Sequence, residues 1–105
     1  MATRLEIEFN YQKAMAQVRE LRSLSTSLKK VGDNQIADCM RDVSKNWKCD
    51  NSTDYVAKGN KLKQKVVKSA GKISDVADAL STMAENIKNA ELKSLDIVKT
   101  DSYKG

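Results

Sequence analysis

The chain has 105 residues, with 19 basic and 14 acidic side chains, two cysteines, and neither histidine nor proline. This length allows one domain with a modest core, and a composition of 40% apolar and 31% charged residues favours long, exposed helices over a sandwich or a compact α/β domain. The lack of histidine excludes a histidine-based triad and the usual zinc sites, while the net charge of +5 predicts only weak attraction to anionic surfaces.

The first nine residues predict a short extended arm over 1–9. Leu5, Ile7 and Phe9 alternate there with charged side chains, which is a period of two. Charges interrupt every apolar run in this segment, so we expect no cleaved signal peptide, and we expect no membrane span in the chain.

A long amphipathic helix is predicted over 10–46, with Asn10 as its N-cap. Apolar or small residues recur in steps of three and four at Tyr11, Ala14, Val18, Leu21, Ser25 and Leu28. Gly32 interrupts this seam, and Ile36, Met40, Val43 and Trp47 resume it in a shifted phase. We expect a change of winding within a continuous helix; the alternative is a true turn that splits the region into two helices.

A bend is predicted over 47–52, because the helical patterns on both sides stop there. The only tryptophan, Trp47, would close the end of a bundle, and Ser52 or Thr53 would cap the next helix. A short bend followed by a strong cap predicts that the second helix folds back antiparallel.

The second helix is predicted over 53–90 and has the most regular pattern of the chain. Its seam consists of Gly59, Leu62, Val66, Ser69, Ile73, Val76, Leu80, Met83, Ile87 and Ala90. Ala70, Ala77 and Ala84 repeat every seven residues beside the seam, and a row of small side chains allows a neighbouring helix to approach closely. Residues 91–105 lose the regular seam, so a fraying helix end and a tail are expected.

Two such helices, each roughly 50 to 55 Å long at 1.5 Å per residue, would cover only part of each other's apolar stripe. The predicted fold is therefore an all-α antiparallel helical hairpin that dimerises into a four-helix bundle. The predicted partner interface comprises Val18, Leu21, Leu28, Ile36, Met40, Val43, Leu62, Val66, Ile73, Val76, Leu80, Met83 and Ile87.

The bend with its flanking helices resembles the WXG family of small type VII (ESX) secretion proteins, which are relatives of the early secreted antigen. In that family a Trp-x-Gly motif joins two helices, and Trp47-Lys48-Cys49 occupies its place here, with Cys49 where glycine is usual. The resemblance covers most of the chain and implies no enzymatic activity, no cofactor and no small-molecule substrate.

The resemblance also implies partners and a location. The chain would be made in the cytoplasm of a Gram-positive bacterium and secreted through the type VII system without a cleavable signal peptide. It would form a homodimer, or a heterodimer with a related hairpin or an effector's N-terminal domain, and would meet the secretion ATPase. The family's Tyr-x-x-x-Asp/Glu export signal is absent, since only Lys104 and Gly105 follow Tyr103. A partner would carry it, or export would use a looser signal within 92–96.

The main rival reading is a basic helical protein that binds nucleic acid. Lys58, Lys61, Lys65, Lys68 and Lys72 recur at helical spacing, and no acidic residue occurs within 55–74. The stripe lacks arginine and interleaved aromatics, so nucleic-acid binding is the less favoured function.

No arrangement of residues predicts catalysis or metal binding. Carboxylate pairs such as Asp38 with Asp42 have ordinary surface spacing, and no phosphate loop or nucleophile elbow is present. Cys39 and Cys49 match no metal-ligand spacing, and we expect free thiols; an intermolecular disulfide through Cys49 is the alternative.

Overall fold

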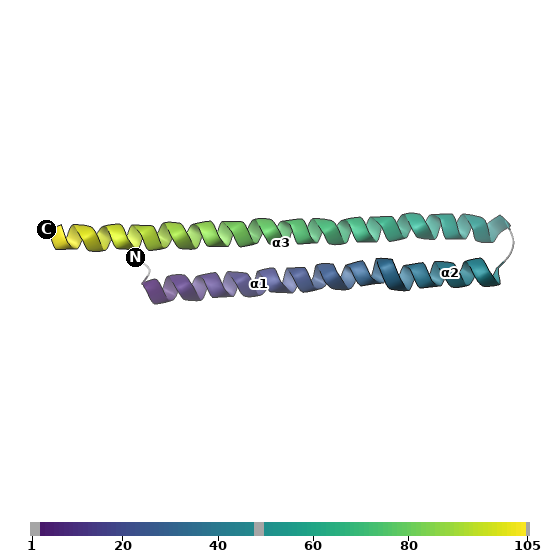
Figure 1. The fold of residues 1–105 in the computed structure, drawn as a ribbon, viewed down its shortest axis with the longest axis horizontal. Coiled ribbons are helices and arrows are strands. Elements are labelled where there is room, and N and C mark those ends of the chain that lie inside the picture. Colours follow the sequence, from purple (N-terminus) through teal and green to yellow (C-terminus); the bar gives the residue numbers. More distant parts are fainter. Residues whose placement is uncertain (1–2, 48–49, 105) are drawn as a thin grey trace. The chain divides into compact units, whose positions relative to one another are not determined.

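The computed structural model describes residues 3–47 and 50–104, and the side chains of residues 3–47 and 51–98. Every described residue except Thr3 and Trp47 is helical, which confirms the predicted all-α class. The elements in chain order are α1 (Arg4–Lys30), the π-helix η1 (Val31–Ile36), α2 (Ala37–Asn46) and α3 (Asp50–Lys104) (Figure 1).

The chain forms two compact units. The bend unit is Leu21–Asp75, and the terminal unit combines Met1–Glu20 with Val76–Gly105. Both α1 and α3 contribute residues to each unit, since each helix runs past a unit boundary.

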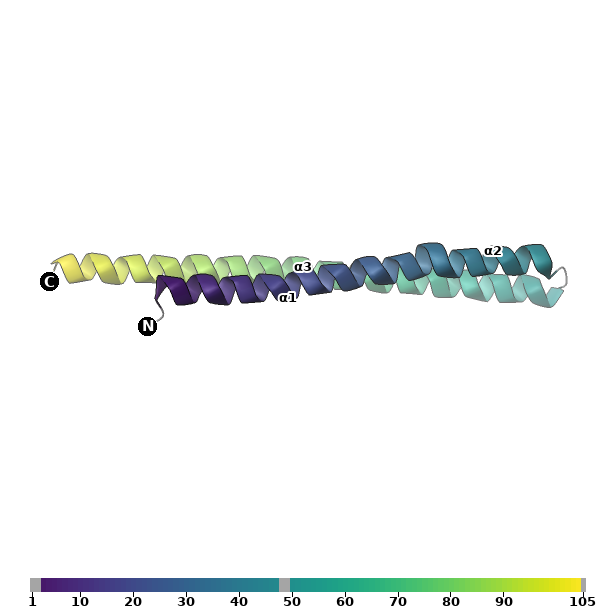
Figure 2. The same cartoon turned by 90° about the horizontal axis from the view of Figure 1, so that it is seen from below.

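The bend unit is an antiparallel helical hairpin (Figures 1 and 2). As the residue number rises on its first arm, the number of the facing residue on α3 falls. The contacting pairs are Ser25 with Ala70, Gly32 with Val67, Met40 with Gly59, and Trp47 with Tyr55. The predicted fold-back is therefore present in this unit.

The terminal unit also pairs α1 with α3 in antiparallel order. Lys88 Nζ lies 4.1 Å from the centre of the Tyr11 ring, and the Ser81 hydroxyl donates a long hydrogen bond of 3.9 Å to Met15 Sδ. Val18 is buried here at 2% exposure. The antiparallel pairing that the sequence predicts is therefore present in this unit as well.

The predicted extended arm over 1–9 is wrong for its described part, because α1 begins at Arg4. The Glu6 N–H donates a hydrogen bond of 3.2 Å to Thr3 Oγ1, so Thr3 and not Asn10 caps the helix. Ile7 is 3% exposed, whereas its neighbour Leu5 is 80% exposed. The segment is therefore a helix with one buried face, although apolar and charged residues alternate along it.

The predicted continuity through Gly32 is confirmed, because α1, η1 and α2 follow one another without a break. From Leu28 to Ile36 the seam advances eight residues instead of seven. In a π-helix each N–H bonds to the carbonyl five residues earlier instead of four, so one extra residue is accommodated. The phase shift of the seam is therefore a π-helix, η1. Gly32 is buried, and a Cβ there would lie 2.7 Å from Val67 Cγ2. The glycine permits this close approach.

The second helix is longer at both ends than the predicted range of 53–90. It begins at Asp50, so Ser52 and Thr53 lie inside α3 and the predicted cap is wrong. It continues to Lys104, so the predicted tail over 91–105 is also wrong up to that residue. No proline or glycine interrupts residues 91–104, and Leu92 and Leu95 are half-buried, which favours continued helix.

Among the described residues, each unit buries one alanine of the α3 row beside larger side chains of the first arm. Ala70 is 1% exposed and Ala77 is fully buried, which confirms that small side chains permit close helix packing. The Ser25 hydroxyl donates a hydrogen bond of 2.7 Å to the Ala70 carbonyl oxygen. Helix α3 thus turns its alanines, and not the whole predicted seam, towards its neighbour.

Candidate partner-binding surface

Helix α3 carries a row of exposed residues at strict seven-residue intervals. We call it the exposed row, and it consists of Tyr55, Leu62, Ser69, Val76, Met83, Ala90 and Ile97. Five members are large and apolar, and these are between 50% and 55% exposed. A heptad row of this kind is one half of a coiled-coil seam. Packing within the hairpin leaves it uncovered.

A groove runs beside the exposed row in the bend unit, with a volume of about 560 Å³. Val31, Gln35 and Cys39 line one wall, spaced four residues apart. Tyr55, Lys58 and Leu62 line the other wall, on α3. Met40 packs against the bare backbone of Gly59 between them: a Cβ at Gly59 would lie 2.8 Å from Met40 Cε.

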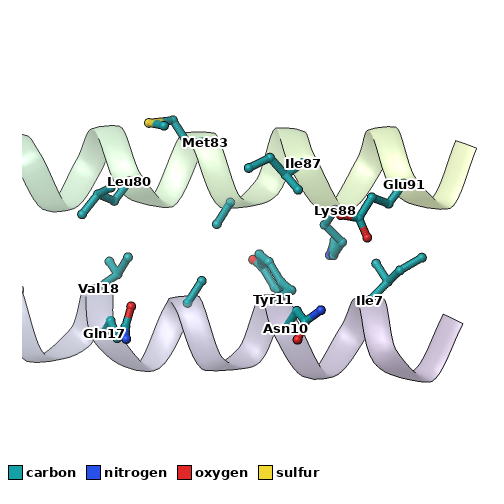
Figure 3. A pocket seen from close by; sticks show the side chains of 12 residues that line it. Ile7, Asn10, Tyr11, Gln17, Val18, Leu80, Met83, Ile87, Lys88 and Glu91 are labelled. Atoms are coloured by element: carbon teal, nitrogen blue, oxygen red, sulfur yellow. The ribbon is translucent and has the colours of Figure 1, made fainter. Parts of the chain in front are cut away.

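The terminal unit has a second groove, with a volume of about 300 Å³. Figure 3 shows Tyr11 and Val18 directed from α1 towards α3, with Lys88 reaching from α3 towards Tyr11. Leu80, Met83 and Ile87 line the α3 side and are 39%, 55% and 56% exposed. In both units, therefore, the groove adjoins members of the exposed row.

The structure divides the thirteen predicted interface residues into three groups. Val18 and Met40 are buried within the chain and offer no surface to a partner. Leu21, Leu28, Ile36, Val43, Val66 and Ile73 are half-buried. Leu62, Val76, Leu80, Met83 and Ile87 are exposed, and all five lie on α3.

Trp47 is the C-cap of α2 and is mostly exposed. Its backbone is extended (φ −111°, ψ 104°), and its N–H donates a hydrogen bond of 2.9 Å to the Val43 carbonyl. The indole ring lies 6.2 Å from the Tyr55 ring, tilted by 43°, and the residue is 59% exposed. Within a single chain, then, Trp47 does not close the end of the hairpin. Lys48 and Cys49 of the motif lie outside the described residues.

The lysines of the predicted stripe face solvent. Lys58, Lys61, Lys65, Lys68 and Lys72 are all exposed. None of them forms an ion pair with another described residue. Their charges are therefore available to a partner from outside the chain.

The sequence patterns did not reveal two contributors to these surfaces, nor the true start of α1. Ile7 was placed in an extended arm but is buried and lines the groove of the terminal unit. Tyr55 contacts Trp47 and lines the groove of the bend unit. The pattern Thr3-Arg4-Leu5-Glu6 matches a capping box and could have located the helix start.

The described residues contain scattered acidic side chains and one exposed thiol. No group of three or more histidine, cysteine, aspartate or glutamate side chains among them could hold a metal ion. Cys39 is an exposed free thiol, as predicted, whereas Cys49, for which an intermolecular disulfide was the alternative, lies outside the described residues. Among the helices of the described chain, none combines the length and the apolar character that crossing a membrane requires.

No known family model matches the sequence, and no curated protein or solved structure is significantly similar to it.

Proposed function

We propose that this chain is a small WXG-like binding protein of type VII secretion, which assembles with a second helical hairpin into a four-helix bundle. It would act as a secreted substrate, or as the targeting partner of an effector. The observation that carries the proposal is the exposed row on α3, because a heptad row of large apolar side chains normally packs against another helix.

Burial of the five exposed residues of the predicted interface would stabilise the assembly; they are Leu62, Val76, Leu80, Met83 and Ile87. Each is roughly half-exposed, and complete burial of such a side chain contributes about 1.5 to 3 kcal/mol, so covering the exposed half contributes about 1 kcal/mol. Together they contribute roughly 5 kcal/mol, before the cost of association is subtracted. A partner that brings a matching apolar row would about double this, which supports an assembly of hairpins over the binding of a short peptide.

The bend supplies the second part of the proposed mechanism. Trp47 and Tyr55 form an exposed aromatic pair beside the end of α2. Aromatic side chains at such positions are frequent anchors in protein interfaces. In the assembly they would lie beside the partner's export signal and form with it the surface that the secretion ATPase binds.

Export from a Gram-positive host with a type VII system tests this function. A tagged chain should accumulate in the medium of the parent strain and remain in the cells of a strain that lacks the secretion ATPase. The double variant Leu62→Ser/Met83→Ser should stay inside the cells, whereas Leu5→Ser, which alters a residue outside the exposed row, should be exported normally. Export that continues without the ATPase would refute the proposal.

A second candidate function is nucleic-acid binding, which the exposure of the five lysines favours. Retardation of DNA or RNA at low salt, lost when Lys61, Lys65 and Lys68 become glutamate, would support it. The absence of retardation at low salt would dismiss it.

A further inference from the structure

The charges of the chain are distributed unequally between its two units. By sequence, the bend unit contains twelve basic and six acidic residues, whereas the terminal unit contains seven basic and eight acidic residues. The entire positive excess therefore belongs to the bend unit. A partner that binds there meets a strongly positive surface.

Within the bend unit, lysines border the exposed row directly. On a helix, a residue is adjacent to those three and four positions away, so Lys58 and Lys65 adjoin Leu62. Lys65 and Lys72 adjoin Ser69 in the same way. These lysines occupy the flanking positions that determine partner choice in coiled coils, where they pair with carboxylates of the facing helix.

The groove of the bend unit has the form that an amphipathic helix requires. It has apolar walls on two helices, and Tyr55 and Leu62 are separated by two helical turns, which is the spacing of anchor residues on a docked helix. Lys58 itself lines this groove. Apolar contact and positive charge are therefore combined at one site.

We propose that the groove of the bend unit selects a helix with acidic flanks, supplied by a different protein. The inference rests on the proposed function, which it narrows from any hairpin to one whose seam is bordered by glutamate or aspartate. A carboxylate opposite each flanking lysine attracts it, whereas a lysine there repels it. Selection of this kind disfavours a second copy that sets its own residues 55–74 against the groove, because they contain no acid, and it favours a heteromeric assembly.

Two designed peptides of 28 residues test the proposal with the full-length chain. Both carry leucine at the seam positions; one has glutamate at the flanking positions and the other has lysine. Fluorescence anisotropy of the labelled peptides at about 0.15 M salt, where the screening length is about 8 Å, measures their affinities. The acidic peptide should bind at least about tenfold more tightly than the basic one, a ratio typical of a few close charge pairs.

Two charge-reversal variants separate local pairing from general attraction. Lys58→Glu/Lys65→Glu alters the flank of the exposed row and should reverse the preference between the peptides. Lys61→Glu/Lys68→Glu changes the net charge equally but alters lysines that do not adjoin the row, so it should weaken acidic-peptide binding by less than about threefold, because screening limits their reach.

Several outcomes would overturn the inference. Equal binding of both peptides would refute selection by charge, but it would not contradict the proposed assembly of a helical bundle. Self-association without binding of either peptide would make a second copy the occupant. Failure of both peptides, together with DNA binding that the two variants weaken equally, would assign the lysines to nucleic acid. Loss of export in the strain without the ATPase tests the proposed function separately.

Discussion

Three glycines of this chain provide a sharp test of the packing, because an added methyl group meets a different environment at each. Replacement of glycine by alanine inside a helix stabilises the folded protein by about 1 kcal/mol through helix propensity alone. At Gly71 a Cβ has no neighbouring atom within 4 Å, so Gly71→Ala should stabilise the protein by about this amount. The melting temperature should then rise by about 4 °C or more for a domain of this size.

At the other two positions the same gain is opposed by a steric clash. A Cβ at Gly59 would overlap Met40 Sδ and would lie 2.8 and 2.9 Å from Met40 Cε and Cγ, and overpacking of this kind costs about 1 to 3 kcal/mol. Gly59→Ala should therefore destabilise the protein by up to about 2 kcal/mol once the gain in propensity is subtracted. Gly32→Ala should cost more, because the β-branched Val67, whose Cγ2 would lie 2.7 Å away, cannot move aside as the flexible Met40 can.

Urea denaturation followed by circular dichroism, at matched protein concentrations, measures all three changes. The expected order of stability is Gly71→Ala, wild type, Gly59→Ala and then Gly32→Ala. Equal stabilisation by all three substitutions would show that the close approaches of Met40 and Val67 do not exist.

The remaining predictions concern single contacts in the two units. Ile7→Ala should destabilise the protein by about 2 kcal/mol or more in thermal unfolding, because Ile7 is buried. Leu5→Ala alters an exposed residue and should change the stability by less than about 0.5 kcal/mol. Equal effects of the two substitutions would favour the extended arm over the helix. Ser25→Ala removes the hydrogen bond to the Ala70 carbonyl and should cost about 1 kcal/mol in urea denaturation, whereas no loss would contradict that contact. Tyr11→Leu removes the ring beneath Lys88 and should cost about 0.5 to 1 kcal/mol, and a Lys88→Met background should abolish that cost.

The sequence predicted the fold class and the antiparallel pairing because both depend on patterns that repeat over many residues. The eight-residue step from Leu28 to Ile36 also indicated where the winding changes, and η1 lies there. The limits of the helices were harder to predict, because ends depend on a few local contacts. Alternation over Leu5, Ile7 and Phe9 suggested a strand, although Ile7 continues the helical spacing of Tyr11, Ala14 and Val18.

The division of the α3 seam could not be predicted from periodicity. Leu62 and Val66 belong to the same predicted seam, yet Leu62 is 54% exposed and Val66 is half-buried. Which flank of an apolar stripe meets the neighbouring helix depends on how closely the backbones approach. The buried Ala70 and Ala77 set that approach here and rotate the wider seam partly away from the hairpin core.

Sedimentation equilibrium tests the central claim most directly, which is that the exposed row on α3 binds another helical hairpin. The chain would be measured alone and mixed with a helical hairpin protein encoded beside it, over a wide concentration range. We expect a complex well above the monomer mass of 11.7 kDa in at least one of the two samples, and its reversal to monomer by Leu62→Ser/Met83→Ser. A mass of 11.7 kDa in both samples at every concentration would contradict the account.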